Sequence, residues 1–247
     1  MNVSEKAKII NSIFYPTLFV VIIWLVKLAE VIFHYNFVVF GIMPLKFSGL
    51  IGIFTSPLIH GDVAHLSANS VPIWVLMATL FYFYRPIAWK VFILTYFVTG
   101  LWVWFFAREA YHIGASGVVY GLATFIFLSG IFRKESRLMA ISMFVIFSYG
   151  GLVWGIFPQL FPEKNISWES HLMGILAGLA LAVYYKNEGP QRKKFSWELE
   201  EEDPNEDENA YWRIPPPAPK PEQPAPIEVN YIYQESEKPE IQDNKEQ

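Results

Sequence analysis

The chain has 247 residues, of which 53% are hydrophobic, 17% aromatic and only 17% charged. Average soluble domains carry about 25% charged residues, so this composition is typical of a membrane protein. The chain contains no cysteine, which excludes disulfides, thiolate metal sites and a cysteine nucleophile. Its formal net charge of −4 is unevenly distributed along the chain.

A membrane-crossing helix needs about 20 mostly apolar residues. The first candidate, residues 12–33, is too long for a signal peptide, carries Lys27 and Glu30, and lacks a small-residue cleavage site. The sequence therefore predicts an all-α membrane protein, a six-transmembrane-helix bundle over residues 12–185 that follows a short N-terminus at residues 1–11. The predicted spans are residues 12–33, 65–84, 89–106, 116–132, 138–157 and 170–185.

The chain changes character at Lys186. Residues 186–247 are acidic, rich in proline and poor in apolar side chains. Such a segment cannot bury enough surface to offset the entropy lost on ordering. We therefore expect a disordered C-terminal tail that acts as a solvated spacer. A docking site for an unknown partner that reads proline-rich segments is the less favoured alternative.

The basic residues of the short loops orient the predicted bundle. Positively charged loops stay in the cytoplasm, and with both termini inside, the outer side holds only Lys46, Arg108 and Lys164. This compact build suggests a multi-pass protein of a bacterial cytoplasmic (inner) membrane. The cytoplasmic side then holds Lys6, Lys8, Arg85, Lys90, Arg133, Lys134, Arg137, Lys186, Arg192, Lys193 and Lys194.

With this orientation the second, fourth and sixth spans all begin at the outer face. Their first turns contain His65 and Asn69, Ser116, and His171. A polar or ionisable side chain in a bilayer costs several kcal/mol unless it faces protein or water. Each histidine alone could be an ordinary interface residue, and Asn69 alone an interhelical hydrogen-bond donor. Together they predict a polar site at one depth.

Glycine spacing sharpens this prediction. Gly117 and Gly121 form GxxxG in the fourth span, and Gly174 and Gly178 form GxxxG in the sixth. Small residues at this spacing let two helices approach closely. Such an approach would bring Ser116 within hydrogen-bond reach of His171, the arrangement of an activated nucleophile.

The chemistry then suggests a role for each residue. His171 would take the Ser116 proton as the hydroxyl attacks a carbonyl, and would return it to the leaving amine. His65, the Asn69 amide and the Ser116 N–H are candidate donors to the oxyanion. Because Asp62 and Glu169 fall in predicted loops, we expect both to be solvated and infer a Ser–His dyad.

Other reaction types fit less well. The nucleophile elbow G-x-S-x-G follows a strand in soluble hydrolases, whereas Val118 occupies its last glycine position and a predicted membrane span comes before it. His60 and His65 have an awkward spacing for one helical face and no pair of ligating carboxylates. We therefore expect no metal, and nothing indicates binding to nucleic acid.

Three motifs together resemble those of the rhomboid intramembrane serine proteases. They are "HGDVAHLSAN" (60–69), "GASGVVYG" (114–121) and "SHLMGILAGLA" (170–180). The first is similar to the family's second-helix motif, the second to its nucleophile motif G-x-S-G, which includes Gly114, and the third to its closing histidine and G-x-x-x-G motif.

The resemblance implies a six-span rhomboid-like core over residues 12–185. It implies Ser116 as nucleophile, His171 as general base, His65 and Asn69 in the oxyanion hole, and Tyr120 packed on His171. It implies no cofactor, and as substrates other transmembrane proteins within the lipid bilayer, cut in or near a membrane span after a small residue.

One departure from the family concerns the first outer loop. Many members carry a Trp-Arg pair there, where this chain has Ile51 and Gly52. Water must also reach the dyad, so we expect a water-filled depression above Ser116 and consider residues 157–170 either a mobile cap or a plain connection. The alternatives to an enzyme are a non-catalytic rhomboid-like membrane-protein binder and a small transporter.

Overall fold

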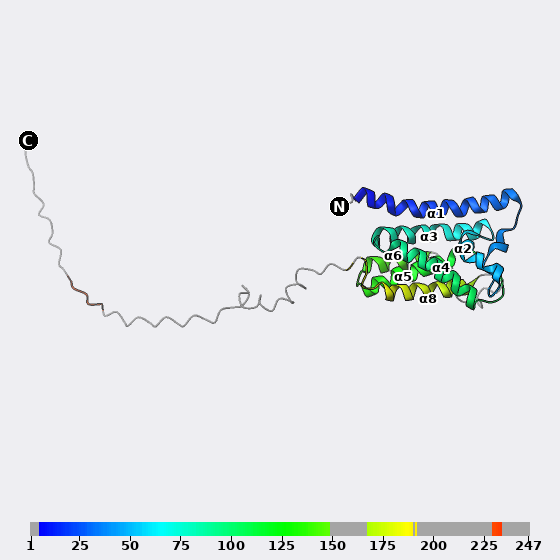
Figure 1. Ribbon diagram of the computed structural model, residues 1–247. Helices are drawn as coiled ribbons and strands as arrows, with labels where there is room; N and C mark the ends of the chain where they lie inside the picture. The colour runs from blue at the N-terminus through cyan, green and yellow to red at the C-terminus, as the bar shows by residue number, and fades with distance from the viewer. Residues whose placement is uncertain (1–4, 149–166, 190, 192–228, 234–247) are drawn as a thin grey trace, which may run out of the picture. The chain divides into compact units, whose positions relative to one another are not determined.

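The computed structural model describes residues 5–148, 167–189, 191 and 229–233. The chain divides into two units, Met1–Lys193 and Lys194–Gln247, and the first contains all the helices in the described ranges (Figure 1). The long helices are α1 (Glu5–Phe33), α3 (Val63–Phe83), α4 (Ala88–Phe106), α5 (Ser116–Phe132), α6 (Ser136–Ser148) and α8 (Trp168–Tyr184).

These six helices coincide with the predicted spans to within a few residues, apart from α1, which begins earlier, and the fifth span. By length and composition, α1, α3 and α4 could cross a membrane, while α5, α6 and α8 are shorter apolar helices. The second half of the predicted fifth span, most of the predicted cap and most of the predicted tail lie outside the described residues.

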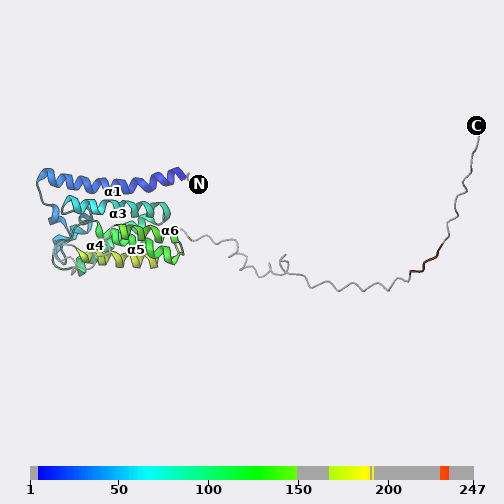
Figure 2. The same ribbon diagram turned by 180° about the vertical axis from the view of Figure 1, so that it is seen from behind.

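Helix α5 occupies the centre of the bundle. It packs most extensively against α8 and also contacts α3, α4 and α6, and the helices lie side by side with similar axis directions (Figures 1 and 2). Large apolar side chains such as Leu122, Phe125 and Ile126 are fully buried along it. A helix that is apolar on every side suits this central position.

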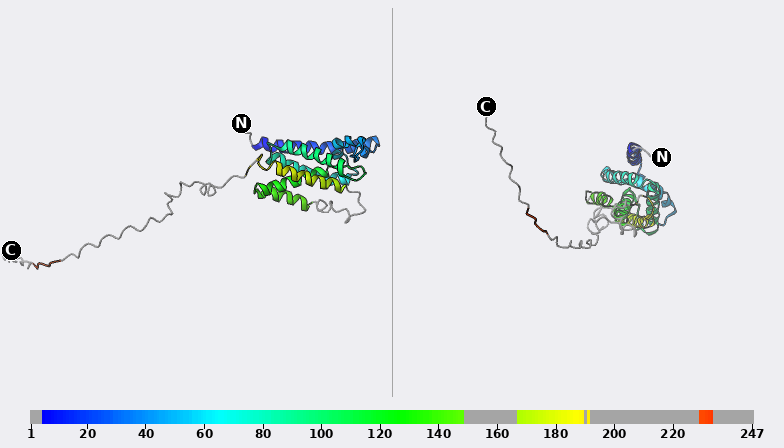
Figure 3. Two further views of the ribbon diagram at one scale, coloured as in Figure 1. Left: turned by 60° about the horizontal axis from the view of Figure 1, so that its bottom comes forward. Right: turned by 90° about the vertical axis from the view of Figure 1, so that its left-hand side faces the viewer.

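Helix α1 lies at the edge of the bundle, where it packs against α3 (Figure 3). Only Ser12, Pro16 and Ile23 of its residues are buried. Its apolar outer side suits contact with lipid tails, which are as apolar as leucine.

Two charged residues in the second half of α1, Lys27 and Glu30, connect the helix to the loops. Lys27 Nζ lies 2.6 Å from Glu30 and donates to the carbonyls of His60 (3.0 Å) and Gly61 (2.9 Å). Glu30 Oε1 in turn accepts the N–H of Phe37 at 3.0 Å. These contacts pair both charges near one end of the helix, which lowers the cost of placing them there.

Short helical turns form the connection between α1 and α3. They are η1 (Phe37–Phe40), η2 (Phe47–Ile51), α2 (Gly52–Thr55) and η3 (Ser56–Leu58). Several of their apolar side chains face outward, with Phe47 88% exposed. Gly52 is buried so tightly that a Cβ would overlap the backbone of Gly41. Position 52 therefore has no room for a side chain in this arrangement of the loop.

Candidate active site

Ser116 and His171 meet at one end of the bundle. They lie at the starts of α5 and α8, and Ser116 Oγ is 2.8 Å from His171 Nε2. Their exposed fractions are only 9% and 7%. The Ser116 hydroxyl donates to the neutral imidazole when Nε2 carries no hydrogen, which is the pairing that a serine nucleophile and its base require.

Tyr120 fixes the plane of the histidine ring. It lies one turn after Ser116 on α5, and its ring stacks on His171 with centroids 4.2 Å apart and planes 14° apart. Both side chains are buried. A flat ring against the imidazole limits rotation of His171 and so helps to hold Nε2 toward Ser116.

The four glycines predicted to bring these helices together lie in their contact. A Cβ on Gly174 would overlap the carbonyl oxygen of Gly117, and one on Gly178 would overlap that of Gly121. In the other direction, a Cβ on Gly121 would lie 3.1 Å from the Gly174 carbonyl oxygen. Backbone therefore lies directly against backbone, as small residues at this spacing allow.

His65 approaches the loop that precedes Ser116. Gly114 has φ +103°, and a Cβ there would lie 2.8 Å from both Cε1 and Nε2 of His65. Only glycine suits this conformation and this close approach. Asn69, one turn further along α3, is buried and its Nδ2 donates to the His65 carbonyl at 2.9 Å.

A second histidine, His60, supports the same loop. Its Nε2 accepts the Ala115 N–H at 3.4 Å, and the Gly114 N–H donates to the Ser56 carbonyl at 2.8 Å. Burial lowers the pKa of His60 to about 3, so the ring stays neutral. The His60 and His65 rings are 5.1 Å apart, but no group of three potential metal ligands occurs among the residues that the structure describes.

The two nearby carboxylates behave differently from each other. Asp62 is exposed and caps α3, since its Oδ1 accepts the His65 N–H at 2.7 Å. The expectation that Glu169 is solvated is wrong. Its side chain belongs to the first turn of α8, is almost fully buried and lies 3.3 Å from Arg108. The positive end of α8 and the guanidinium compensate for its burial.

Sequence reasoning missed the role of His112, which is 1% exposed. Its backbone forms an isolated antiparallel bridge with Ile42. Its ring Nδ1 lies 2.6 Å from Ser167 Oγ, and Nε2 lies 3.0 Å from the Arg108 carbonyl oxygen. Its place four residues before Ser116, in the glycine-containing stretch, was the one available hint.

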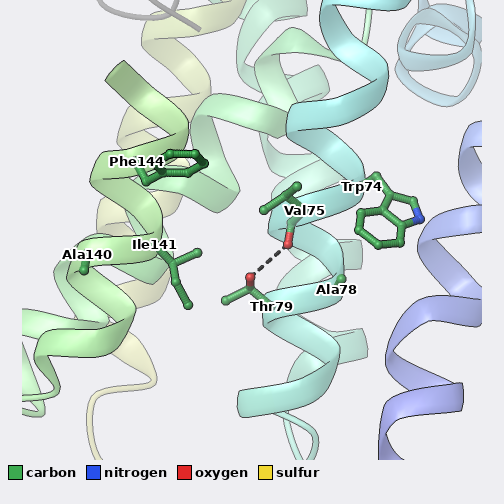
Figure 4. Close-up of a pocket in the computed structure, with 7 residues that line it drawn as sticks. All are labelled: Trp74, Val75, Ala78, Thr79, Ala140, Ile141 and Phe144. Atoms are coloured by element: carbon green, nitrogen blue, oxygen red, sulfur yellow. Dashed lines mark hydrogen bonds between the residues drawn. The ribbon is translucent and has the colours of Figure 1, made fainter. Parts of the chain in front are cut away.

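A hollow of about 540 Å³ lies away from this site, between α3 and α6 (Figure 4). Its lining is apolar except for Thr79, whose hydroxyl donates to the Val75 carbonyl at 2.9 Å. It therefore offers no side chain for catalysis. The lining residues are Trp74, Val75, Ala78, Thr79, Ala140, Ile141 and Phe144.

Comparison with known proteins finds a matching family model and several relatives. The model of the Rhomboid domain matches residues 48–188. An uncharacterized protein of Mycobacterium tuberculosis is 34% identical over 183 residues, which cover 71% of this chain and 75% of the relative. One of Mycobacterium leprae is 31% identical over 71% of each chain.

A more distant relative carries the family name. It is an Acanthamoeba polyphaga mimivirus protein called "Putative rhomboid protein", 27% identical over 60% of this chain and 85% of its own length. The domain match includes the first turns of α3, α5 and α8 and the glycines between them. The chain, a membrane protein with apolar helices, belongs to the rhomboid family.

Proposed function

We propose that the protein is an intramembrane serine endopeptidase that cuts peptide bonds in or near the membrane spans of other proteins. The observation that carries the proposal is the 2.8 Å contact between Ser116 Oγ and His171 Nε2 in a buried setting. A purely binding member of the family would have no use for a hydroxyl and an imidazole in this geometry.

The reaction proceeds through an acyl-enzyme. As Ser116 Oγ bonds to the substrate carbonyl carbon, its proton passes to His171 Nε2. The C–N bond then breaks, and the same proton goes to the departing amine. Water attacks the ester next, His171 takes one of its protons and returns it to Ser116 Oγ, and the new carboxyl end is released.

The tetrahedral intermediates carry a negative oxygen that needs donors in place beforehand. The Ser116 N–H lies at the start of α5, where the positive end of the helix dipole favours negative charge. His65, held against Gly114, and the second N–H of the Asn69 amide supply further donors. No metal or cofactor takes part in this scheme.

In the membrane we place six spans, with both termini and the acidic tail in the cytoplasm of a bacterial cell and the dyad near the outer surface. The chain lacks cysteine, so single-cysteine variants can test this. A membrane-impermeant maleimide should label Glu109→Cys in intact cells, and should label Asn187→Cys only after lysis. Labelling with the opposite preference would invert the orientation.

A fluorophosphonate probe tests the catalytic proposal directly. The purified protein in detergent should form an adduct at Ser116, mapped by mass spectrometry, and both Ser116→Ala and His171→Ala should abolish it. Ser129→Ala, which removes another buried hydroxyl of α5, is the matched control and should label normally. Folded protein that never labels would indicate the non-catalytic binder.

A further inference from the structure

We infer that His112 is a positioning residue for the dyad. It acts through Ser167, the residue that precedes α8, and Ser170 in the first turn of that helix. The inference rests on the proposed function. His112 touches neither Ser116 nor His171 in the contacts described above. It connects the loop before the nucleophile to the helix that carries the base.

The direction of the hydrogen bonds follows from the acceptor at one end. The Arg108 carbonyl oxygen, 3.0 Å from Nε2, can only accept, so Nε2 carries the hydrogen and Nδ1 of the neutral ring accepts. Nδ1 therefore takes the Ser167 hydroxyl at 2.6 Å, and Ser167 Oγ accepts the Ser170 hydroxyl at 2.6 Å. The donor and the acceptor of each hydrogen bond in this series are therefore defined.

The Ser167 side chain does not form the hydrogen bond that is usual for its position. Ser167 is the N-cap of α8, where a serine side chain normally accepts a backbone N–H of the first turn. Here the side chain makes no such bond. Its carbonyl accepts the N–H groups of Ser170 (3.1 Å) and His171 (3.4 Å), as the carbonyl of an N-cap residue normally does. The residue that anchors the His171 backbone is thus itself held by His112.

His112 is well placed for this role because three segments meet on it. Its backbone pairs with Ile42 of the α1–α3 connection, through N–H to O distances of 3.0 and 2.9 Å. Its own loop runs into Ser116, and its ring reaches α8. A small shift of the base away from the nucleophile costs large factors in rate, about 10²-fold for 1 Å.

Protonation of His112 at low pH would change the direction of these hydrogen bonds. A second ring proton makes Nδ1 a donor, so the Ser167 hydroxyl can no longer donate to it and the chain must reverse. Among the described residues the charged groups around His112 are Arg108 of its own loop and Glu169 of α8. Burial is the main cause that lowers the pKa of His112.

The test measures fluorophosphonate labelling of the full-length protein as kinact and KI. His112→Phe should lower kinact about 10-fold to 100-fold with KI within about twofold. His112→Asn, whose Oδ1 can accept the Ser167 hydroxyl, should recover most of the rate. The acid limb of its pH profile should also be shallower, because residue 112 no longer titrates. His34→Phe, at an exposed histidine, is the control and should match the wild type.

Two results would overturn the inference: an unchanged kinact in His112→Phe, or a His112→Asn variant as slow as His112→Phe. If His112→Phe does not fold, Ser167→Ala replaces it as the test, and the same loss of kinact is expected. Wild-type protein that is folded but unlabelled would refute the proposed function itself, whereas labelled wild type with fully active variants would refute only the role of His112.

Discussion

Two helix contacts of the bundle differ in how they are built. Between α5 and α8, glycines place one backbone against the other, and no space is left for a Cβ at Gly174 or Gly178. Between α3 and α6, apolar side chains leave a hollow of about 540 Å³ (Figure 4). The first contact carries the two residues of the candidate dyad, and the second carries none of the candidate site residues.

This difference indicates where the molecule tolerates change. Close-packed backbone transmits any added atom as a displacement of a whole helix, whereas a hollow can take up added volume locally. The α5–α8 contact should therefore be sensitive to a single methyl group, and the α3–α6 contact should not.

The largest effect is expected from Gly174→Val. Its side chain would collide with the Gly117 carbonyl and force α8 away from α5. We expect fluorophosphonate labelling to fall at least 100-fold, since misplaced catalytic groups lose about that much. Ala180→Val, which enlarges an exposed residue of the same helix, is the control. Equal labelling of both variants would show that the glycine contact does not set the dyad.

A smaller effect is expected at Tyr120. Tyr120→Ala removes the ring that stacks on His171, and a pair of this kind contributes about 0.5–1.5 kcal/mol, so labelling should slow about 10-fold. Tyr120→Phe keeps the ring and should label nearly as the wild type does. A strong loss in Tyr120→Phe would instead assign the role to the hydroxyl.

The pH dependence of stability tests a third region, the loop before Ser116 that His60 supports. The folded-state pKa of His60 is about 3, below its ordinary value of 6.5. The unfolded chain therefore binds more protons below pH 6.5, and the free energy of unfolding falls as the pH drops from 6.5 toward 3. Thermal unfolding of His60→Gln should depend less on pH in that range. An unaltered pH dependence would mean that His60 is not buried as a neutral ring.

The smallest effect is expected from Ala140→Leu, which adds volume to the hollow between α3 and α6. Labelling should stay within about twofold of the wild type, and stability should change by less than about 1.5 kcal/mol, as for a tolerated apolar change. A loss comparable to that of Gly174→Val would remove the distinction between the two contacts.

Much of the helical layout could be predicted from hydropathy alone, because apolar runs of this length usually form membrane helices. The close approach of α5 and α8 followed from the positions of four glycines. What could not be predicted depends on tertiary partners. Glu169 reads as a loop residue until Arg108, which is 61 positions earlier in the chain, is seen beside it.

The same limit applies to His112 and to the α1–α3 connection. Nothing near His112 in sequence indicates Ser167, and the contact exists only once α8 returns to the loop before Ser116. The short turns of residues 37–58 have no apolar period that would identify them, since their geometry depends on backbone contacts such as that of Gly52 with Gly41.

The glycine contact has one more consequence. Because main chain lies against main chain, no change of side-chain rotamer can separate α5 from α8, and Ser116 and His171 are already paired without a bound substrate. In the proposed protease, regulation would therefore act on the access of substrates to this pair rather than on its assembly.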